Sequence, residues 1–227
     1  MHNVPDFYLY GFRLISRKDD HLRKKEIKNT ILFHIVNAEK NQELLEHVPH
    51  EVYLDLAFVF FYMADWESGR KKVFLFNNKQ MREYGITKEE LKQWSMENTP
   101  RLLPVSFHPM DDLLRGFQFE EHPSRRTKPL PVEQVPMYVL TNVKMFLGAA
   151  CLFYPKVLSS IGNTLQSDFY ILPSSIHECI ILPSSDAYTK NELEEIVHEV
   201  NTSQVPEQEI LSDHVYFYQN KTKKTSK

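Results

Sequence analysis

The chain has 227 residues, of which 42% are hydrophobic and 25% are charged, and its formal net charge at pH 7 is −3. This composition is typical of a soluble globular protein and argues against a duplex-binding protein, which usually has a strong basic bias. The longest uncharged apolar run, Leu56 to Ala64, is far shorter than the roughly 20 residues that a membrane-spanning helix needs.

The N-terminus and the cysteines indicate a compartment. No basic region followed by an apolar stretch opens the chain, which argues against a secretory signal. Cys151 and Cys179 lie inside apolar runs and are predicted to be reduced core thiols. We therefore expect a cytoplasmic protein that does not associate with a membrane.

Two helices are predicted near the start of the chain. Ile27, Ile31 and Ile35 recur at a spacing of four residues, which predicts a helix that ends near Val36. A shorter helix is predicted to follow and to end before Pro49, because the residue before a proline disfavours helical geometry.

A strongly apolar segment follows. Residues 52–65, VYLDLAFVFFYMAD, are too apolar for a strand with one exposed face, so we predict one buried central strand there. Residues 71–78 are predicted to form its return strand, and residues 102–109 a further strand.

Two capping-box signatures mark helix starts. The pattern Thr-x-x-Glu begins at Thr87 and again at Thr189. In such a box the side chain of each residue accepts a hydrogen bond from the backbone amide of the other, and these amides have no partner within the helix. We predict helices from these positions to about Asn98 and Val200.

The periodic pattern is lost in the middle of the chain. Residues 118–135 contain three prolines and show no periodicity, which predicts a flexible linker or loop. It would separate an N-terminal α+β portion, residues 1–117, from a C-terminal α+β portion, residues 136–220. Residues 221–227, KTKKTSK, are predicted to be a disordered basic tail.

The C-terminal portion is predicted to contain several strands and a helix after Pro155. The predicted strands include residues 136–142, residues 148–154 and the segment 215–218. Strands and helices are mixed without a regular β-α-β rhythm. The predicted fold class is therefore α+β, with a mixed, largely antiparallel sheet and packed helices.

The pentapeptide ILPSS occurs twice within residues 168–188, on either side of His177 and Glu178. We interpret this segment as a β-hairpin, because proline and serine are typical of strand ends and turns. Side chains alternate along a strand, so Glu178 would point away from His177, which argues against a triad of Ser175, His177 and Glu178.

Neither a metal nor a cofactor is predicted. No His-Glu-x-x-His motif occurs, and two cysteines cannot form a zinc knuckle. The six glycines are not clustered, which argues against a phosphate-binding loop. The basic segment 124–128 is interpreted as a solvated loop, so a nucleic-acid partner is not favoured.

Several stretches also carry a family resemblance: VPHEVYLDLAFVFFY, ITKEELKQWSMENTPRLLP, MYVLTN with GAACLFYPKVL, SDFYILPSSIHECIILP and EVNTSQVPEQEILSDHVYFY. Over about residues 20–220, the chain resembles an uncharacterised family of anaerobic Gram-positive bacteria, known only as a domain of unknown function. Family members often carry a further N-terminal segment, so the resemblance implies a shorter variant or an internal start. It implies a bacterial, cytoplasmic protein and no catalytic residues.

The leading hypothesis is a non-enzymatic binding or interaction module with an unknown protein or small-molecule partner. Polar residues concentrate on the predicted turns 174–177, 201–204 and 212–214, where binding residues are often held by rigid strands. The candidate binding residues are Ser174, Ser175, His177, Asn201, Gln204, Asp213 and Arg101.

Two alternatives remain open. The first is a hydrolase that uses Ser175, His177 and Asp213, brought together in space. The second is a nucleic-acid-associated factor that uses the 124–128 loop and the basic tail. The sequence favours a protein without enzymatic activity and leaves the question of an enzyme undecided.

Overall fold

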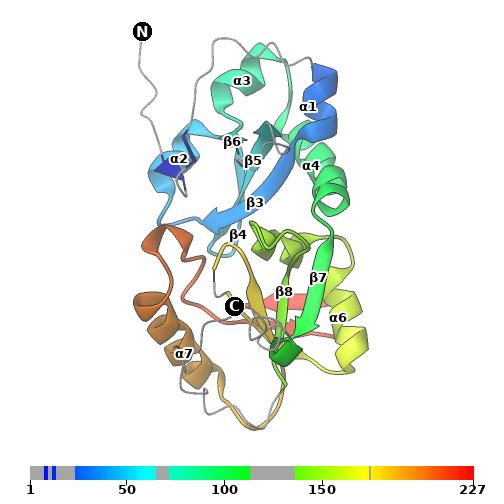
Figure 1. The fold of residues 1–227 in the computed structure, drawn as a ribbon, viewed down its shortest axis with the longest axis vertical. Helices are drawn as coiled ribbons and strands as arrows, with labels where there is room; N and C mark the ends of the chain where they lie inside the picture. Colours follow the sequence, from blue (N-terminus) through cyan, green and yellow to red (C-terminus); the bar gives the residue numbers. More distant parts are fainter. Residues whose placement is uncertain (1–7, 10–11, 14–23, 65–71, 113–135, 174) are drawn as a thin grey trace, which may run out of the picture. The chain divides into compact units, whose positions relative to one another are not determined.

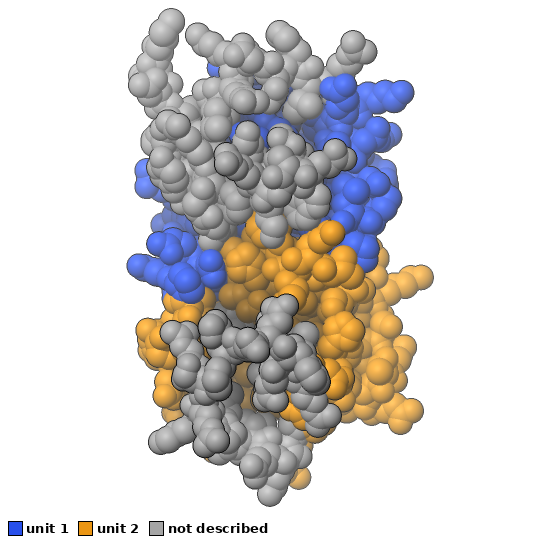
Figure 2. Space-filling view, viewed as in Figure 1, with its two compact units in different colours: residues 1–104, 206–211 blue, residues 105–205, 212–227 orange. Residues whose placement is uncertain are grey.

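The computed structural model describes residues 8–9, 12–13, 24–64, 72–112, 136–173 and 175–227. The chain divides into two compact units, which Figure 2 colours separately. The first unit contains residues 1–104 and 206–211, and the second contains residues 105–205 and 212–227. This division differs from the predicted portions 1–117 and 136–220. The predicted linker, residues 118–135, lies outside the described residues.

The predicted fold class, α+β, is confirmed. The described strands form three sheets, in which every pair of neighbouring strands is antiparallel, and helices separate many of the strands along the chain (Figure 1). None of the helices in the described ranges is long and apolar enough to cross a membrane.

The first unit is built around β5 (Leu56–Ala64), which pairs with β3 (Leu32–Asn37) on one edge and with β4 (His50–Tyr53) and β6 (Lys72–Leu75) on the other. The unit's other described elements are β1 (Tyr8–Leu9), β2 (Phe12–Arg13), α1 (Lys24–Thr30), α2 (Gln42–His47), α3 (Asn78–Glu83), α4 (Lys88–Leu102) and η2 (Glu207–Glu209).

The prediction of one helix to Val36 is wrong. Helix α1 ends at Thr30, and residues from Leu32 to Asn37 form β3, which is buried along its whole length. Aromatic and β-branched side chains favour a pleated, buried surface, and pairing with β5 overrides the helical spacing of the isoleucines.

The apolar segment 52–65 contains a turn that the sequence analysis missed. Leu54 adopts a left-handed conformation, with φ of 56°, and divides the segment into β4 and β5. The central position and the burial predicted for this segment are confirmed for β5, since it has partners on both edges and Phe60 is 1% exposed.

Helix α4 begins at the predicted capping box. The Thr87 Oγ1 atom accepts from the Glu90 backbone amide at 3.1 Å, and the Glu90 Oε2 atom accepts from the Thr87 amide at 2.9 Å. The helix continues through Pro100 to Leu102, beyond the predicted end at Asn98. Pro100 has no amide hydrogen to donate to the Met96 carbonyl, but the helix continues past it, and the Leu103 amide still donates to the Thr99 carbonyl at 2.8 Å.

The second unit contains a six-stranded antiparallel sheet in the order β12-β11-β9-β10-β8-β7. Its strands are β7 (Val105–Pro109), β8 (Tyr138–Asn142), β9 (Phe169–Leu172), β10 (Cys179–Pro183), β11 (Tyr216–Gln219) and β12 (Lys224–Ser226). Its helices are η1 (Gly148–Phe153), α6 (Val157–Leu165) and α7 (Lys190–Ser203). The predicted hairpin is confirmed as β9 and β10.

Two predictions for the second unit differ from the structure. Residues 148–153 form the 3-10 helix η1 instead of a strand. A Cβ atom on Gly148 would lie 2.1 Å from the Thr141 Oγ1 atom, so this helix approaches β8 closely through small residues. At the C-terminus, Lys224–Ser226 pairs with β11 as strand β12, where a disordered tail was expected.

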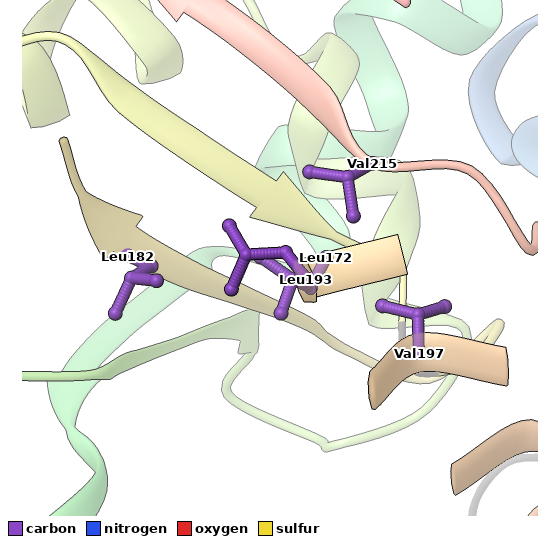
Figure 3. Packing of buried hydrophobic residues seen from close by; sticks show 5 residues of the cluster. All are labelled: Leu172, Leu182, Leu193, Val197 and Val215. Atoms are coloured by element: carbon purple, nitrogen blue, oxygen red, sulfur yellow. The ribbon is translucent and has the colours of Figure 1, made fainter. Parts of the chain in front are cut away.

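The two faces of the second sheet bury different sets of side chains. Phe169, Ile171, Cys179 and Ile181 alternate along β9 and β10 on one face, and each is at most 1% exposed. On the opposite face, helix α7 packs its apolar side chains against the strands. The core residues there are Leu172, Leu182, Leu193, Val197 and Val215 (Figure 3).

Candidate functional site

Helix α7 is held in place by a capping box and an apolar stripe. The Thr189 backbone amide donates to the Glu192 carboxylate at 2.7 Å, and the Thr189 hydroxyl oxygen accepts from the Glu192 amide at 3.3 Å. From there, Leu193, Val197 and Asn201 recur every four residues and are buried. A spacing of four places them on one face of the helix, which is the face toward the sheet.

A cavity of about 280 Å³ lies between α7 and the sheet. Leu172, Ile180 and Leu182 form the sheet side of its wall. The α7 side is formed by Leu193, Ile196, Val197, Glu199, Val200, Asn201 and the following Gln204. Met110, Met137 and Tyr188 complete the lining. Most of the described lining is apolar, and its polar groups are the Tyr188 hydroxyl and the side chains of Glu199, Asn201 and Gln204, as is common in sites for small molecules.

Asn201 is the buried polar residue of this wall, with a relative exposure of 1%. Its Nδ2 atom donates to the Ser212 carbonyl oxygen at 3.0 Å and to the Asp213 Oδ1 atom at 2.8 Å. These bonds join the end of α7 to the segment that leads into β11.

The Asn201 Oδ1 atom is buried and has no hydrogen-bond partner among the described residues. The orientation of the amide is set by its neighbours, because a carbonyl and a carboxylate can only accept and therefore require the NH₂ group. A flipped amide would place its oxygen against two acceptors. The unsatisfied buried atom is therefore an acceptor, and buried acceptors normally have a partner.

Acidic groups lie near the C-terminal half of α7. Glu199 belongs to the cavity wall, and the Asp213 carboxylate lies beside Asn201. The Asp213 Oδ1 atom is 3.9 Å from the His198 Nδ1 atom, and the Glu194 Oε1 atom is 3.9 Å from the His214 Nδ1 atom. These side chains are partly exposed, so water screens their charges.

Ser175 and His177 lie in the turn between β9 and β10, in a hydrogen-bond network of their own. The Ser175 hydroxyl donates to the Glu178 Oε1 atom at 2.8 Å and accepts from the His177 amide at 3.0 Å. The His177 Nδ1 atom accepts from the Leu147 amide at 3.1 Å. Because β11 pairs with β9, residues 212–214 enter the sheet at the same end as this turn.

These contacts do not form the hydrolytic triad of the first alternative. A neutral His177 that accepts at Nδ1 carries its proton on Nε2, whereas a triad base needs a free Nε2 and an acid at Nδ1. Ser175 bonds Glu178, and Asp213 bonds Asn201. The Asp213 carboxylate therefore lies beside Asn201 and not at the His177 Nδ1 atom, which accepts from the Leu147 amide.

The other candidate residues have different surroundings. Gln204 is exposed, ends α7 and belongs to the cavity wall. Arg101 belongs to the first unit, where its guanidinium donates to the Asn29 carbonyl at 3.1 Å and to the Asn98 Oδ1 atom at 2.9 Å. There it joins the end of α1 to α4. Ser174 lies outside the described residues.

The core thiols are as predicted. Cys151 and Cys179 are free and buried. Burial raises the pKa of the Cys151 thiol to about 12, which keeps it protonated and unreactive at neutral pH. In the part of the chain that the structure describes, no three His, Cys, Asp or Glu side chains are grouped so that they could hold a metal ion.

The sequence analysis selected Asn201 and Gln204 but missed the cavity that they line. The apolar stripe of α7, Leu193, Ile196, Val197 and Val200, is visible in the sequence. Such a stripe normally indicates core packing, and only the fold shows that a cavity lies between it and the sheet.

A comparison with protein families gives a match over most of the chain. Residues 15–220 match a family model described as a family of unknown function, DUF5688. This range includes both units. No curated protein and no solved structure matches the chain.

Proposed function

The chain belongs to this family of unknown function, whose description carries no activity, and we propose from the geometry that its second unit is a non-enzymatic binding module for a small apolar molecule. The observation that carries the proposal is the apolar cavity of about 280 Å³ between α7 and the sheet. As part of the same proposal, the protein acts in a reducing compartment such as the cytoplasm, because both cysteines are free thiols.

The size of the cavity supports a small ligand. Protein interiors are close-packed, and cavities much larger than a water molecule are few per domain. An engineered apolar cavity of roughly 150 Å³ is dry and binds benzene or xenon. The cavity beside α7 is about twice as large, which suits a compact molecule of roughly two fused rings.

The walls of the cavity are held by packing that does not depend on a ligand. Leu193 and Val197 of α7 are buried against Leu172 and Leu182 of the hairpin (Figure 3). Met110 and Met137 of the lining are joined by a backbone hydrogen bond of 2.8 Å. Methionine side chains are flexible and adapt to the shape of a ligand.

The experiment uses the full chain with two neutral probes of equal size, indole and benzofuran. Saturation-transfer NMR is expected to detect binding of at least one probe to the wild-type protein. Ile196→Trp fills the cavity from α7 and is expected to abolish the transfer. Val200→Phe fills the same space and replaces Ile196→Trp in this test if the Ile196→Trp protein does not fold.

Glu195→Trp is the matched control, because Glu195 is exposed on the same helix and does not line the cavity. This variant is expected to bind the probes as the wild-type protein does. The proposal fails if neither probe receives saturation from the wild-type protein, or if a folded Ile196→Trp protein binds as well as the wild-type protein.

A further inference from the structure

The basic segment at the end of the chain forms an ordered hairpin. Strands β11 and β12 pair in antiparallel register, with Gln219 opposite Lys224. The Lys223 amide closes the connecting loop by donating to the Gln219 carbonyl at 2.8 Å. Lys221, Lys223 and Lys224 are therefore held together on this loop and at the start of β12, and all three are exposed. Residues 219–227 are called the basic hairpin below.

The charges of these lysines are not neutralised by ion pairs in the described ranges. No carboxylate there pairs with Lys221, Lys223 or Lys224. The Asp168 carboxylate contacts the hairpin through the Asn220 backbone amide, from which it accepts at 2.8 Å. Like charges held on a short loop repel one another, so a polyanion that contacts all three lysines is attracted to the hairpin.

Lys223 is positioned by neutral groups. Its φ of 56° lies in the left-handed region, which is uncommon for residues other than glycine. Its Nζ atom donates to the Asn163 Oδ1 atom of α6 at 3.0 Å and to the Asn220 Oδ1 atom. An ammonium group has three N–H donors, so one remains for an external acceptor. Because both amide oxygens are neutral, the full positive charge of Lys223 is available to that acceptor.

The composition of the basic hairpin indicates the kind of acceptor. Its side chains other than lysine are amides and hydroxyls, and phosphate groups of nucleic acids accept hydrogen bonds from both kinds. It contains no apolar side chain, whereas protein interfaces have an apolar centre and membrane-surface segments insert apolar side chains. We propose that the basic hairpin binds the phosphate backbone of a single-stranded nucleic acid without regard to base sequence.

The net charge of the chain, −3, favours a single strand over a duplex. A duplex is stiff over many base pairs, so its phosphates extend past the hairpin toward a surface of the opposite preference. A flexible single strand can contact the hairpin alone. Stacking of bases requires exposed aromatic side chains, and residues 219–227 contain none. Binding is therefore electrostatic. The 124–128 loop lies outside the described residues, so the proposal rests on the hairpin alone.

The test measures fluorescence anisotropy of a labelled uridine oligonucleotide titrated with the full chain. Three phosphate contacts on a single strand give a slope of about −2 for log K against log salt concentration, so Kd is expected to increase about 20-fold between about 50 and 200 mM NaCl. The triple variant Lys221→Gln, Lys223→Gln, Lys224→Gln is expected to lose binding at the lower salt concentration.

The matched control changes Lys40, Lys79 and Lys88 to glutamine. These lysines are exposed in the first unit, and their replacement changes the net charge by the same amount. The control is expected to bind as the wild-type protein does. If circular dichroism shows that the triple variant does not fold, Lys221→Gln alone is expected to reduce the size of the salt slope by about 0.7.

Absence of binding by the wild-type protein, or binding that salt does not weaken, would overturn the proposal. Equal affinities of the wild-type protein and a folded triple variant would overturn it as well. Tighter binding to a duplex of the same length, to vesicles that contain phosphatidylserine or to polyglutamate would assign the hairpin to a different partner and overturn it too. The cavity probes are neutral, so none of these outcomes depends on the proposed function.

Discussion

Asn201, at the end of α7, donates a hydrogen bond of 2.8 Å to the carboxylate of Asp213, which precedes β11. The same Nδ2 atom donates to the carbonyl oxygen of Ser212, a residue with an exposure of 0%. One buried amide thus joins a helix end to a strand entry, and the same residue belongs to the lining of the cavity. Experiments on it need to measure both stability and binding.

Asn201→Ala is expected to lower the free energy of unfolding of the second unit by about 1–3 kcal/mol, because the buried Ser212 carbonyl loses its donor. Urea denaturation followed by circular dichroism measures the change. Gln204→Ala is the control, since removal of this exposed amide should change the free energy of unfolding by no more than about 0.5 kcal/mol. Equal stability of the two variants would mean that the Asn201 bonds contribute little.

His177→Ala is expected to destabilise the second unit by about 1–3 kcal/mol. The Leu147 amide, on a residue that is 2% exposed, would lose its acceptor, and the ring contact with Phe146 would be lost as well. His214→Ala, whose side chain is 47% exposed, is the control for loss of a histidine. A His177→Ala protein with the stability of the wild type would argue against this structural role.

Phe60→Ala is expected to lower the free energy of unfolding by about 3–5 kcal/mol. Phe60 is 1% exposed in the central strand of the first unit, and removal of its side chain leaves a cavity. Denaturant unfolding, compared with that of Tyr53→Ala, provides the measurement. Tyr53 is 41% exposed and should cost far less. A loss below about 1 kcal/mol for Phe60→Ala would contradict the central position of β5.

The capping box of α7 predicts a dependence of stability on pH. The Thr189 amide donates to the Glu192 carboxylate and lowers its pKa below the ordinary value of 4.5. The carboxylate therefore stabilises the folded state above about pH 4.5, and this contribution is lost as the pH falls through the lowered pKa.

The matching variant is Glu192→Gln, which keeps the shape of the box without the charge. The thermal midpoint of this variant is expected to lie below that of the wild-type protein at pH 7, and the difference is expected to shrink as the pH falls below 4.5. Glu195→Gln, at an exposed position outside the box, is the control. A difference between wild type and Glu192→Gln that does not change with pH would refute the role of the charge.

The sequence alone was sufficient for features whose partners are near neighbours in the chain. Both capping boxes involve residues three apart, so Thr87 and Thr189 mark helix starts without any knowledge of the fold. The hairpin of β9 and β10 is also local, because its strands are joined by a short turn and alternate apolar side chains over two faces. These features also establish the α+β class.

The tertiary structure decided the features that depend on distant partners. Residues 32–37 form a strand because β5 supplies a pairing edge, which outweighs a weak helical preference. Asn201 and Asp213 could be selected as polar turn residues, but the bond between them, and the unpaired Asn201 oxygen, arise only where the chain has placed the end of α7 beside the entry to β11. The cavity has the same origin: α7 and the strands carry apolar residues that their own patterns assign to a core, and only the docking of the helix on the sheet determines how much of that surface stays open.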